Sequence, residues 1–165
     1  MKKLQLNISE RIFCLDILNA FKGSHDQLAV IFQDILKFPI IDAEWEKREK
    51  GFWFKNNGVL EYITGTNYFY VNWWRIDIGY PIYIDADRDF FYVWKYCEDD
   101  PKCTGLIYIT DRRSGKTYKA TCILYEATSR TPDSQSGIQS KNDKDAKKVF
   151  NKLILSWQRL PDFFK

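Results

Sequence analysis

Aromatic residues are concentrated in the middle of this chain. Sixteen of its 28 phenylalanine, tryptophan and tyrosine residues fall between Gly51 and Tyr96. Aromatic and β-branched side chains favour a pleated, half-buried surface, so this stretch is typical of strands in an antiparallel sheet. It also carries more aromatic area than a small core requires, and aromatic side chains are common anchors of binding surfaces. The sequence therefore predicts an aromatic sheet with a binding role.

The chain is long enough for one domain with its own core, at 165 residues and 19.7 kDa. No apolar run approaches the ~20 residues that span a bilayer. The basic start lacks the apolar stretch and the small-residue cleavage site of a secretion signal. The cysteines form no CxxC pair, and in a reducing compartment such thiols are usually small buried hydrophobic residues; they are Cys14, Cys97, Cys103 and Cys122. We therefore expect a cytoplasmic protein with no membrane association and no cofactor.

Helix signals lie at both ends of the chain. Capping residues and apolar spacing predict helices over residues 9–22, 24–38 and 42–50, the last of which ends at Gly51. Another helix is predicted after Asn142, where an apolar stripe contains Ala146, Val149, Phe150, Leu153, Ile154 and Trp157. Leu153 and Trp157 are expected to be buried against the sheet.

The middle of the chain has the period of two that is typical of strands. Residues 67–78 and 116–126 alternate, and residues 88–97 are apolar on both faces, which predicts a central or covered strand. Residues 56–58, Asn-Asn-Gly, and residues 111–115 have the composition of hairpin turns.

The expected fold class is α+β, with one domain over residues 1–165. Two or three N-terminal helices and one C-terminal helix pack on a mixed or antiparallel, aromatic-rich sheet of five to seven strands. The expected parts are 1–50 (helical), 51–128 (sheet), 129–141 (polar loop) and 142–165 (C-terminal helix and tail). A loop as long as 129–141 is typical of a functional or disordered segment.

Motifs for catalysis and metal binding are weak. Residues 113–117, Arg-Ser-Gly-Lys-Thr, end like a phosphate-binding loop, but Thr110 stands where its first glycine belongs. The aspartates of 85–89 open like a calcium loop, but Phe90 replaces the required glycine. His25 is the one histidine and lies in a predicted capping turn. We expect no catalytic residue and no metal site; a hydrolase built on these aspartates is the least favoured alternative, and we interpret them as a solvated turn.

Charge is distributed unevenly along the chain. Residues 1–50 are balanced, residues 51–110 have a net charge of −3 and residues 111–165 have a net charge of +6. A basic C-terminal third fits an acidic partner, either nucleic acid or an acidic protein face, although it is more often a solvated surface.

Binding of single-stranded nucleic acid is the alternative function. Proteins of that class combine stacking rings with nearby cations. The candidate rings are Tyr68, Trp73, Tyr80 and Tyr83, and the candidate cations are Arg75, Arg112, Arg113, Lys116 and Lys119. The aromatic segment is net acidic, which opposes the electrostatic attraction that such binding requires, and RNP and GXXG motifs are missing. A protein partner is therefore favoured.

Four segments near the N-terminus share a pattern of helix packing. They are residues 9–12 (SERI), 18–23 (LNAFKG), 28–31 (LAVI) and 38–47 (FPIIDAEWEK). Together they resemble the first part of small bacteriophage-encoded proteins with no assigned activity. The rest of the chain departs from that pattern. The resemblance implies a phage origin, and with it one of two roles in the host cytoplasm: a virion or accessory component, or an inhibitor of a bacterial defence system.

The function we expect from the sequence is that of a non-enzymatic protein-binding module with a host or virion protein as partner. Its surface is predicted where the polar end of the 67–78 strand meets the basic 112–116 turn. The expected binding residues are Trp73, Arg75, Asp77, Tyr80, Arg112, Arg113 and Lys116. Of these, Trp73, Arg75 and Tyr80 are the expected anchors, and the cations of the turn act mainly on the association rate.

Overall fold

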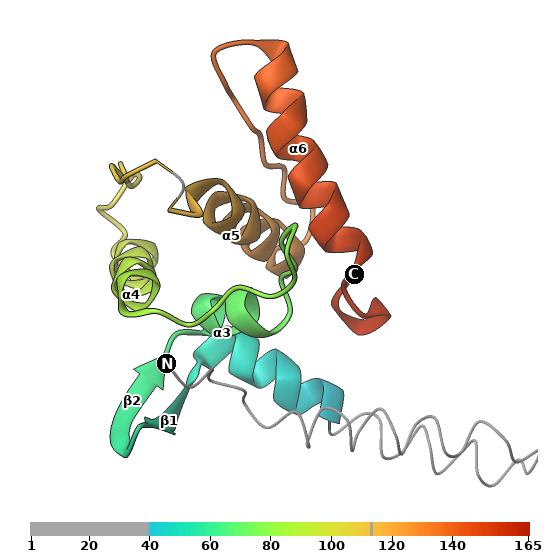
Figure 1. Ribbon diagram of the computed structural model, residues 1–165. Coiled ribbons are helices and arrows are strands. Elements are labelled where there is room, and N and C mark those ends of the chain that lie inside the picture. The colour runs from blue at the N-terminus through green and yellow to red at the C-terminus, as the bar shows by residue number, and fades with distance from the viewer. Residues whose placement is uncertain (1–39, 113) are drawn as a thin grey trace, which may run out of the picture.

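The structure is a computed structural model that describes residues 40–112 and 114–165 (Figure 1). The described part begins with a helix over residues 40–50. The elements that follow are β1 (Phe52–Asn56), β2 (Val59–Ile63), α3 (Gly65–Asn72), α4 (Asp85–Asp99), α5 (Lys116–Arg130), α6 (Asp143–Gln158) and the 3-10 turn η2 (Asp162–Phe164). The helices predicted over 9–22 and 24–38 lie outside the described residues. Within the described ranges, no helix is long and apolar enough to cross a membrane.

The predicted sheet of five to seven strands is wrong. In the described part of the chain the sheet has two strands, β1 and β2, and most of the remaining structure is helical. Three ranges were expected to be strands. Residues 88–97 and 116–126 lie within α4 and α5, and 67–78 begins in α3 and continues into the connection that follows it. Residues 111–115 lead into α5, so they are not the turn of a hairpin. The fold still combines α and β structure, but helices build its core.

The β-hairpin formed by β1 and β2 follows from local turn chemistry. β1 and β2 are antiparallel, with Phe52 opposite Ile63 and Asn56 opposite Val59. Asn57 and Gly58 connect them with φ angles of 50° and 87°, the left-handed region that asparagine and glycine tolerate best. The predicted hairpin turn at 56–58 is therefore confirmed.

α4 has a helical period that the strand interpretation missed. Its buried residues are Asp87, Phe90 and Phe91, and Trp94 is half-buried, so inward positions recur every three or four residues. Asp85 and Asp87 lie in the first turn, where carboxylates stabilise the positive end of the helix dipole. The apolar residues on the opposite side of α4 include exposed Val93, which made both faces look buried in the sequence.

α5 also has one buried face with helical spacing. Lys119, Cys122 and Glu126 follow one another at three and four residues, and Tyr125 lies beside them. Two of these four residues are charged. The buried face of α5 therefore contains few apolar residues, and the spacing of apolar residues in the sequence does not reveal the helix. The alternation of Tyr118 and Cys122 with polar neighbours favoured a strand instead.

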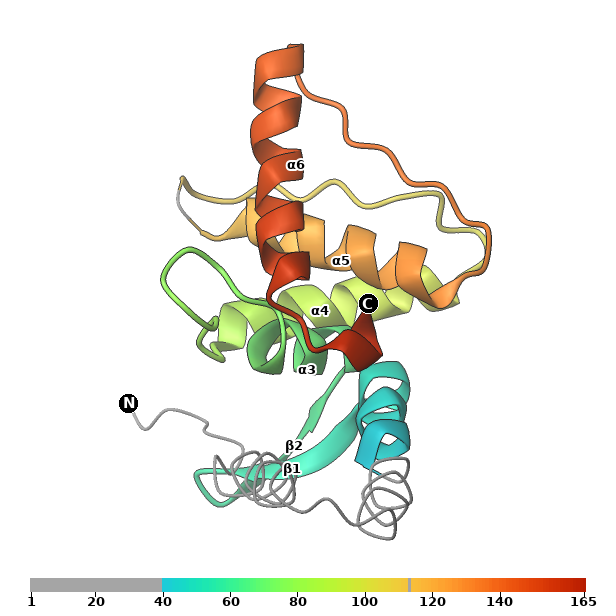
Figure 2. The ribbon, with the colours of Figure 1, turned by 90° about the vertical axis from the view of Figure 1, so that its right-hand side faces the viewer.

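α3 lies at the centre of the molecule. Figure 2 shows it between the hairpin and the 40–50 helix on one side and α4 and α5 on the other. Seven of its eight residues are buried, as expected for a helix surrounded by other elements. The buried core cluster consists of Phe69, Tyr70, Trp74, Phe90, Phe91, Cys122, Tyr125, Leu160 and Phe164. Many of the aromatic residues of the chain thus fill a helical core.

A glycine allows the 40–50 helix to approach the start of α3. A Cβ atom on Gly65 would overlap the carbonyl oxygen of Arg48 and would lie 2.6 Å from its carbonyl carbon. Because both obstacles are backbone atoms, a side chain cannot be accommodated by a rotamer change. We expect Gly65→Ala to lower the free energy of unfolding by about 1–3 kcal/mol, as overpacking does. Urea unfolding measures this loss.

Gly105→Ala is the matched control for this substitution. A Cβ on Gly105 has nothing within 4 Å, and the backbone there has no left-handed φ. The expected change is within about 0.5 kcal/mol of zero. Equal losses for the two variants would show that the close approach of the 40–50 helix to α3 does not limit stability.

The C-terminal helix was predicted correctly, but its packing was not. Asn142 caps α6 by accepting a hydrogen bond from the backbone N–H of Asp145 at 2.8 Å. Among the described elements α6 packs on α5 and not on the β1–β2 sheet, and one end of α6 projects away from the body (Figure 1). Leu153 is half-buried against the core, whereas Trp157 is exposed, so the expected burial of Trp157 is wrong. The loop predicted over 129–141 corresponds to a connection without helix or strand over residues 131–142.

Candidate functional site

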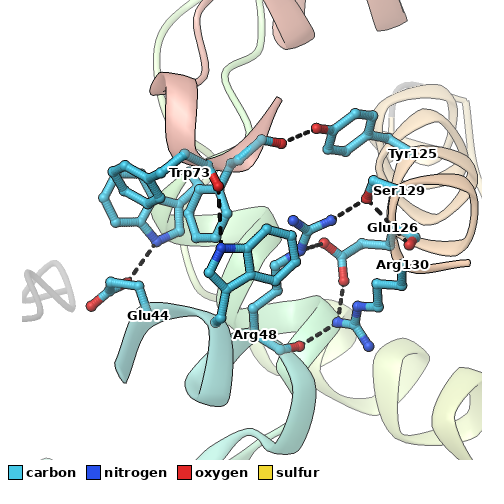
Figure 3. A network of polar contacts seen from close by, with 10 residues as sticks. Glu44, Arg48, Trp73, Tyr125, Glu126, Ser129 and Arg130 are labelled. Atoms are coloured by element: carbon cyan, nitrogen blue, oxygen red, sulfur yellow. Dashed lines mark hydrogen bonds and ion pairs between the residues drawn. The ribbon is translucent and has the colours of Figure 1, made fainter. Parts of the chain in front are cut away.

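Arg48 and Glu126 form a buried ion pair between the 40–50 helix and α5. Nε of Arg48 donates to Oε1 of Glu126, and Nη2 of Arg48 donates to the hydroxyl of Ser129 (Figure 3). Arg130 donates to Oε2 of the same carboxylate and to the backbone carbonyl of Arg48. Burial raises the pKa of the Glu126 carboxyl, while Arg48 and Arg130 oppose that rise. One carboxylate thus holds two guanidinium groups.

Aromatic rings surround the guanidinium group of Arg48. Its central carbon lies 4.3–5.5 Å from the centroids of four rings, those of Trp45, Phe69, Tyr125 and Phe164. The C-terminal η2 turn closes this cluster, because Nε1 of Trp45 donates to the carbonyl of Phe163 at 3.1 Å and the Tyr125 hydroxyl donates to that of Phe164. Cations over ring faces gain further stability when they are desolvated. The Arg48 network is filled by its own side chains, and we interpret it as a structural centre.

Lys119 and Asp87 form a second buried pair, between α5 and α4. The Lys119 ammonium lies 2.5 Å from Oδ1 of Asp87 and 3.5 Å from the Tyr108 hydroxyl. Asp85 and Asp89 instead face solvent and pair with Arg88. The three carboxylates that resemble a calcium loop therefore do not converge on one point. In the described residues no group of three or more His, Cys, Asp or Glu side chains could hold a metal ion.

Trp73 lies at the end of α3 and is part of the packing. Its Nε1 donates to Oε2 of Glu44 at 3.0 Å, and its ring meets those of Phe163 and Phe164 edge to face at 5.7 Å and 5.2 Å (Figure 3). Replacing Trp73 would therefore change folding as well as any binding. Of the three expected anchors, Trp73 is the one that contributes to the packing of the protein.

Arg75, Asp77 and Tyr80 lie together on the exposed segment that joins α3 to α4. We call residues 75–84 the 75–84 loop. The Arg75 guanidinium lies 4.8 Å from the centroid of the Tyr80 ring, and Asp77 pairs with Lys152 of α6 at 3.1 Å. The Tyr118 hydroxyl and Lys152 hold the pKa of Asp77 below its usual value. These three predicted binding residues are thus neighbours in the structure.

The start of the 75–84 loop is fixed by a tight turn and by α6. Ile76 and Gly79 exchange two backbone hydrogen bonds, of 2.7 Å and 3.1 Å, and Gly79 has a φ of 121°. The Ser156 hydroxyl donates to the carbonyl of Arg75 at 2.5 Å, and Arg159 donates to that of Ile76 at 3.3 Å. The turn is therefore held by contacts within the chain.

The outer side of this loop is apolar. Alternate positions carry large exposed side chains, and we call them the apolar stripe: Ile78, Tyr80, Ile82 and Ile84. Ile78, at the tip of the turn, is 91% exposed. Between them, Tyr83 points back to the body and donates to Glu61 at 3.0 Å. The three isoleucines are not among the predicted binding residues, although their alternation over 78–84 is visible in the sequence.

The predicted basic residues lie at the start of α5. Arg112 and Lys116 are exposed, and the Lys116 ammonium donates to the carbonyls of Thr110 and Asp111 at 3.3 Å and 3.4 Å. Arg113 lies outside the described residues. Tyr118, two residues after Lys116, accepts a hydrogen bond from Lys152 at 3.0 Å. This contact links the first turn of α5 to the α6 residue that pairs with Asp77.

Several residues proposed for nucleic-acid binding are engaged inside the protein. Tyr68 and Lys119 are buried, and the Tyr83 hydroxyl bonds to Glu61. Of the proposed stacking rings, Tyr80 is the one on an exposed surface together with a cation, Arg75.

The cysteines described by the structure form no disulfide with one another. Cys122 is buried in the core, where burial raises the pKa of its thiol well above the usual value. Cys97 and Cys103 are half-buried, and a hydrogen bond between them raises the pKa of Cys97. Cys14 lies outside the described residues. Comparison of the chain with protein-family models, curated proteins and solved structures finds no match, so the candidate site rests on the geometry of the 75–84 loop.

Proposed function

We propose that the protein is a non-enzymatic binding module, that its partner is another protein, and that the 75–84 loop is the binding surface. The apolar stripe carries the proposal. Exposed apolar patches rimmed by charged groups are typical of protein interaction sites. Ile78 projects furthest into solvent and is the central anchor.

The fixed shape of the loop supports this role. The turn between Ile76 and Gly79 is held by its own backbone hydrogen bonds and by Ser156 and Arg159 of the C-terminal region. A surface that is already ordered loses little conformational entropy when it binds.

The charges around the apolar stripe indicate the kind of partner. Arg75 and Arg159 lie beside the turn, and Lys152 and Asp77 form an ion pair there whose charges offset each other. A basic rim fits a partner whose apolar pocket has acidic groups at its edge, and such rim charges mainly accelerate association.

The resemblance of residues 9–47 to bacteriophage proteins extends the proposal to a biological role. We propose a phage-encoded accessory protein or an inhibitor of a bacterial defence system, acting on a host or virion protein in the host cytoplasm. A small module with a preformed apolar anchor and no assigned catalytic group fits either role.

The test is the double substitution Ile78→Ser with Ile82→Ser. Both side chains are exposed, so we expect the fold to be retained and binding of the partner to weaken at least about tenfold, as loss of a central anchor does. Tagged protein captures partners from a bacterial lysate with and without nuclease, and the affinity is then measured with the purified partner. Val59→Ser with Leu60→Ser is the matched control, because these residues are also exposed but lie on the hairpin.

Three outcomes would contradict the proposal. Capture that is abolished by nuclease would identify single-stranded nucleic acid as the ligand, which is the alternative function. Equal affinity of the Ile78 and Ile82 variant and the wild-type protein would place the surface elsewhere. Failure of the wild-type protein to capture any partner would remove the proposed role.

A further inference from the structure

Residues 104–110 form a second exposed apolar segment, separate from the 75–84 loop. They connect α4 to α5 in an extended path without assigned helix or strand (Figure 2). Their sequence, Thr-Gly-Leu-Ile-Tyr-Ile-Thr, contains no charge and no proline. Ile107 and Ile109 are 88% and 89% exposed, which makes them, with Ile78, the most exposed large apolar residues described. We call this stretch the 104–110 segment.

The inner side of the 104–110 segment is packed on the protein. The ring of Tyr108 lies 4.4 Å from that of Phe90 in α4, and Lys119 of α5 lies over its face at 5.3 Å. Leu106 packs against the core cluster. Leu106 and Tyr108 thus contact the protein, Tyr108 with 37% of its surface still exposed, while Ile107 and Ile109 face solvent, which is the alternation of a strand with one packed face.

The backbone of the 104–110 segment is not paired with other described backbone, although the carbonyls of Gly105 and Thr110 accept side-chain hydrogen bonds from Cys103 and Lys116. None of its residues exchanges a backbone hydrogen bond with another described residue. Figure 1 shows the segment at the outer side of α4 and α5, on the opposite side of α5 from α6. Unpaired, uncharged stretches rich in β-branched residues are templates for pairing with a second strand.

The charges that flank the 104–110 segment identify the second strand. Residues 98–102 contain three acids and one lysine, a net charge of −2, and two of these acids, Glu98 and Asp99, also pair with Lys95. Residues 111–116 contain one acid and three bases, a net charge of +2. When two copies of the chain lie antiparallel, the acidic flank of each faces the basic flank of the other. A parallel arrangement would place like charges together.

We propose that the 104–110 segment is a self-association edge, at which two copies of the chain pair antiparallel about a twofold axis. Centred on Tyr108, the pairing sets Ile107 of each copy opposite Ile109 of the other, so that the four isoleucine side chains lie side by side on one face and shield part of one another's surface from water. The same patch serves both copies, as a twofold interface requires. The pairing leaves the 75–84 loop out of the contact and does not depend on the proposed function.

Sedimentation equilibrium of the full chain tests the self-association. Over loading concentrations from about 1 µM to about 200 µM we expect a monomer–dimer equilibrium. Ile107→Lys with Ile109→Lys should weaken the dimer at least about tenfold, because two charges per copy would face each other across the pair. Val59→Lys with Leu60→Lys, on the exposed hairpin, should leave it unchanged. A wild-type chain that stays monomeric, or a lysine variant that dimerises like the wild type, would overturn the proposal.

Charge reversal tests the antiparallel arrangement separately. Arg112→Glu with Arg113→Glu makes both flanks acidic, and Glu98→Lys with Asp99→Lys makes both flanks basic. Each variant alone should dimerise at least about tenfold more weakly than the wild type, since like charges then face each other. An equimolar mixture should recover the dimer as a heterodimer, because every flank again faces its opposite charge. A mixture no stronger than either variant alone would reject the antiparallel pairing.

Discussion

Arg48→Ala is expected to lower the free energy of unfolding by about 3–5 kcal/mol, a large share of the stability of a small domain. The substitution leaves the Glu126 carboxylate buried with Arg130 as its remaining cation, and it leaves the hydroxyl of Ser129 without its donor. It also empties the space that the guanidinium group fills between four rings. Urea unfolding followed by tryptophan fluorescence measures the loss.

Lys50→Ala provides the control on the same helix. Lys50 pairs with Glu46 at 3.2 Å, but both side chains are exposed, so the expected loss is below about 1 kcal/mol. Arg48→Ala combined with Glu126→Ala should cost less than the sum of the two single changes, because neither charge is then left unpaired. Additive losses would show that Arg48 stabilises the protein through ring contacts and not through Glu126.

Trp74→Ala is expected to destabilise the protein by about 3–5 kcal/mol, the usual cost of removing a buried tryptophan. Trp74 is fully buried, its ring stacks on that of Tyr125 at 5.3 Å and lies 6.0 Å from that of Phe69. It follows the last residues of α3 and fills the space between that helix and α5. The truncation therefore removes the contact between the central helix and its main neighbour, and denaturant unfolding measures the effect.

Trp74→Phe separates the contribution of the ring from that of the indole N–H. Nε1 of Trp74 is buried without a hydrogen-bond partner among the described residues. Phenylalanine keeps an aromatic face against Tyr125 and removes this unpaired polar group, so we expect it to retain most of the stability that alanine loses. If phenylalanine were as harmful as alanine, Nε1 would have to make an essential contact.

The aromatic residues explain why the predicted sheet failed. The preference of aromatic and β-branched residues for strands spans only about 1 kcal/mol, and it depends on what covers the side chain. In α3 the surrounding elements cover every side, so Tyr68, Phe69 and Tyr70 are all buried and no helical stripe appears in the sequence. Short apolar runs of this kind do not distinguish a buried helix from a buried strand.

Long-range packing separates Trp73 from the other residues of the predicted binding site. Arg75, Asp77 and Tyr80 were placed near one another because they lie close in the sequence, and they meet on the 75–84 loop. Trp73, only two residues before Arg75, contacts Glu44 and the C-terminal turn instead. Glu44, which accepts the hydrogen bond from Trp73, is 29 residues away in the sequence, so no local pattern indicates this contact.

What the sequence determined by itself is the set of features that depend on neighbouring backbone atoms: the end of a helix at Gly51, the hairpin turn at Asn57 and Gly58, and the α6 cap at Asn142. Left-handed φ angles and capping bonds act within a few residues, so residue identity is sufficient. The tertiary structure decided which aromatic residues enter the core and which charges are buried. Arg48 and Glu126 lie 78 residues apart, and they form a pair because packing brings their two helices together.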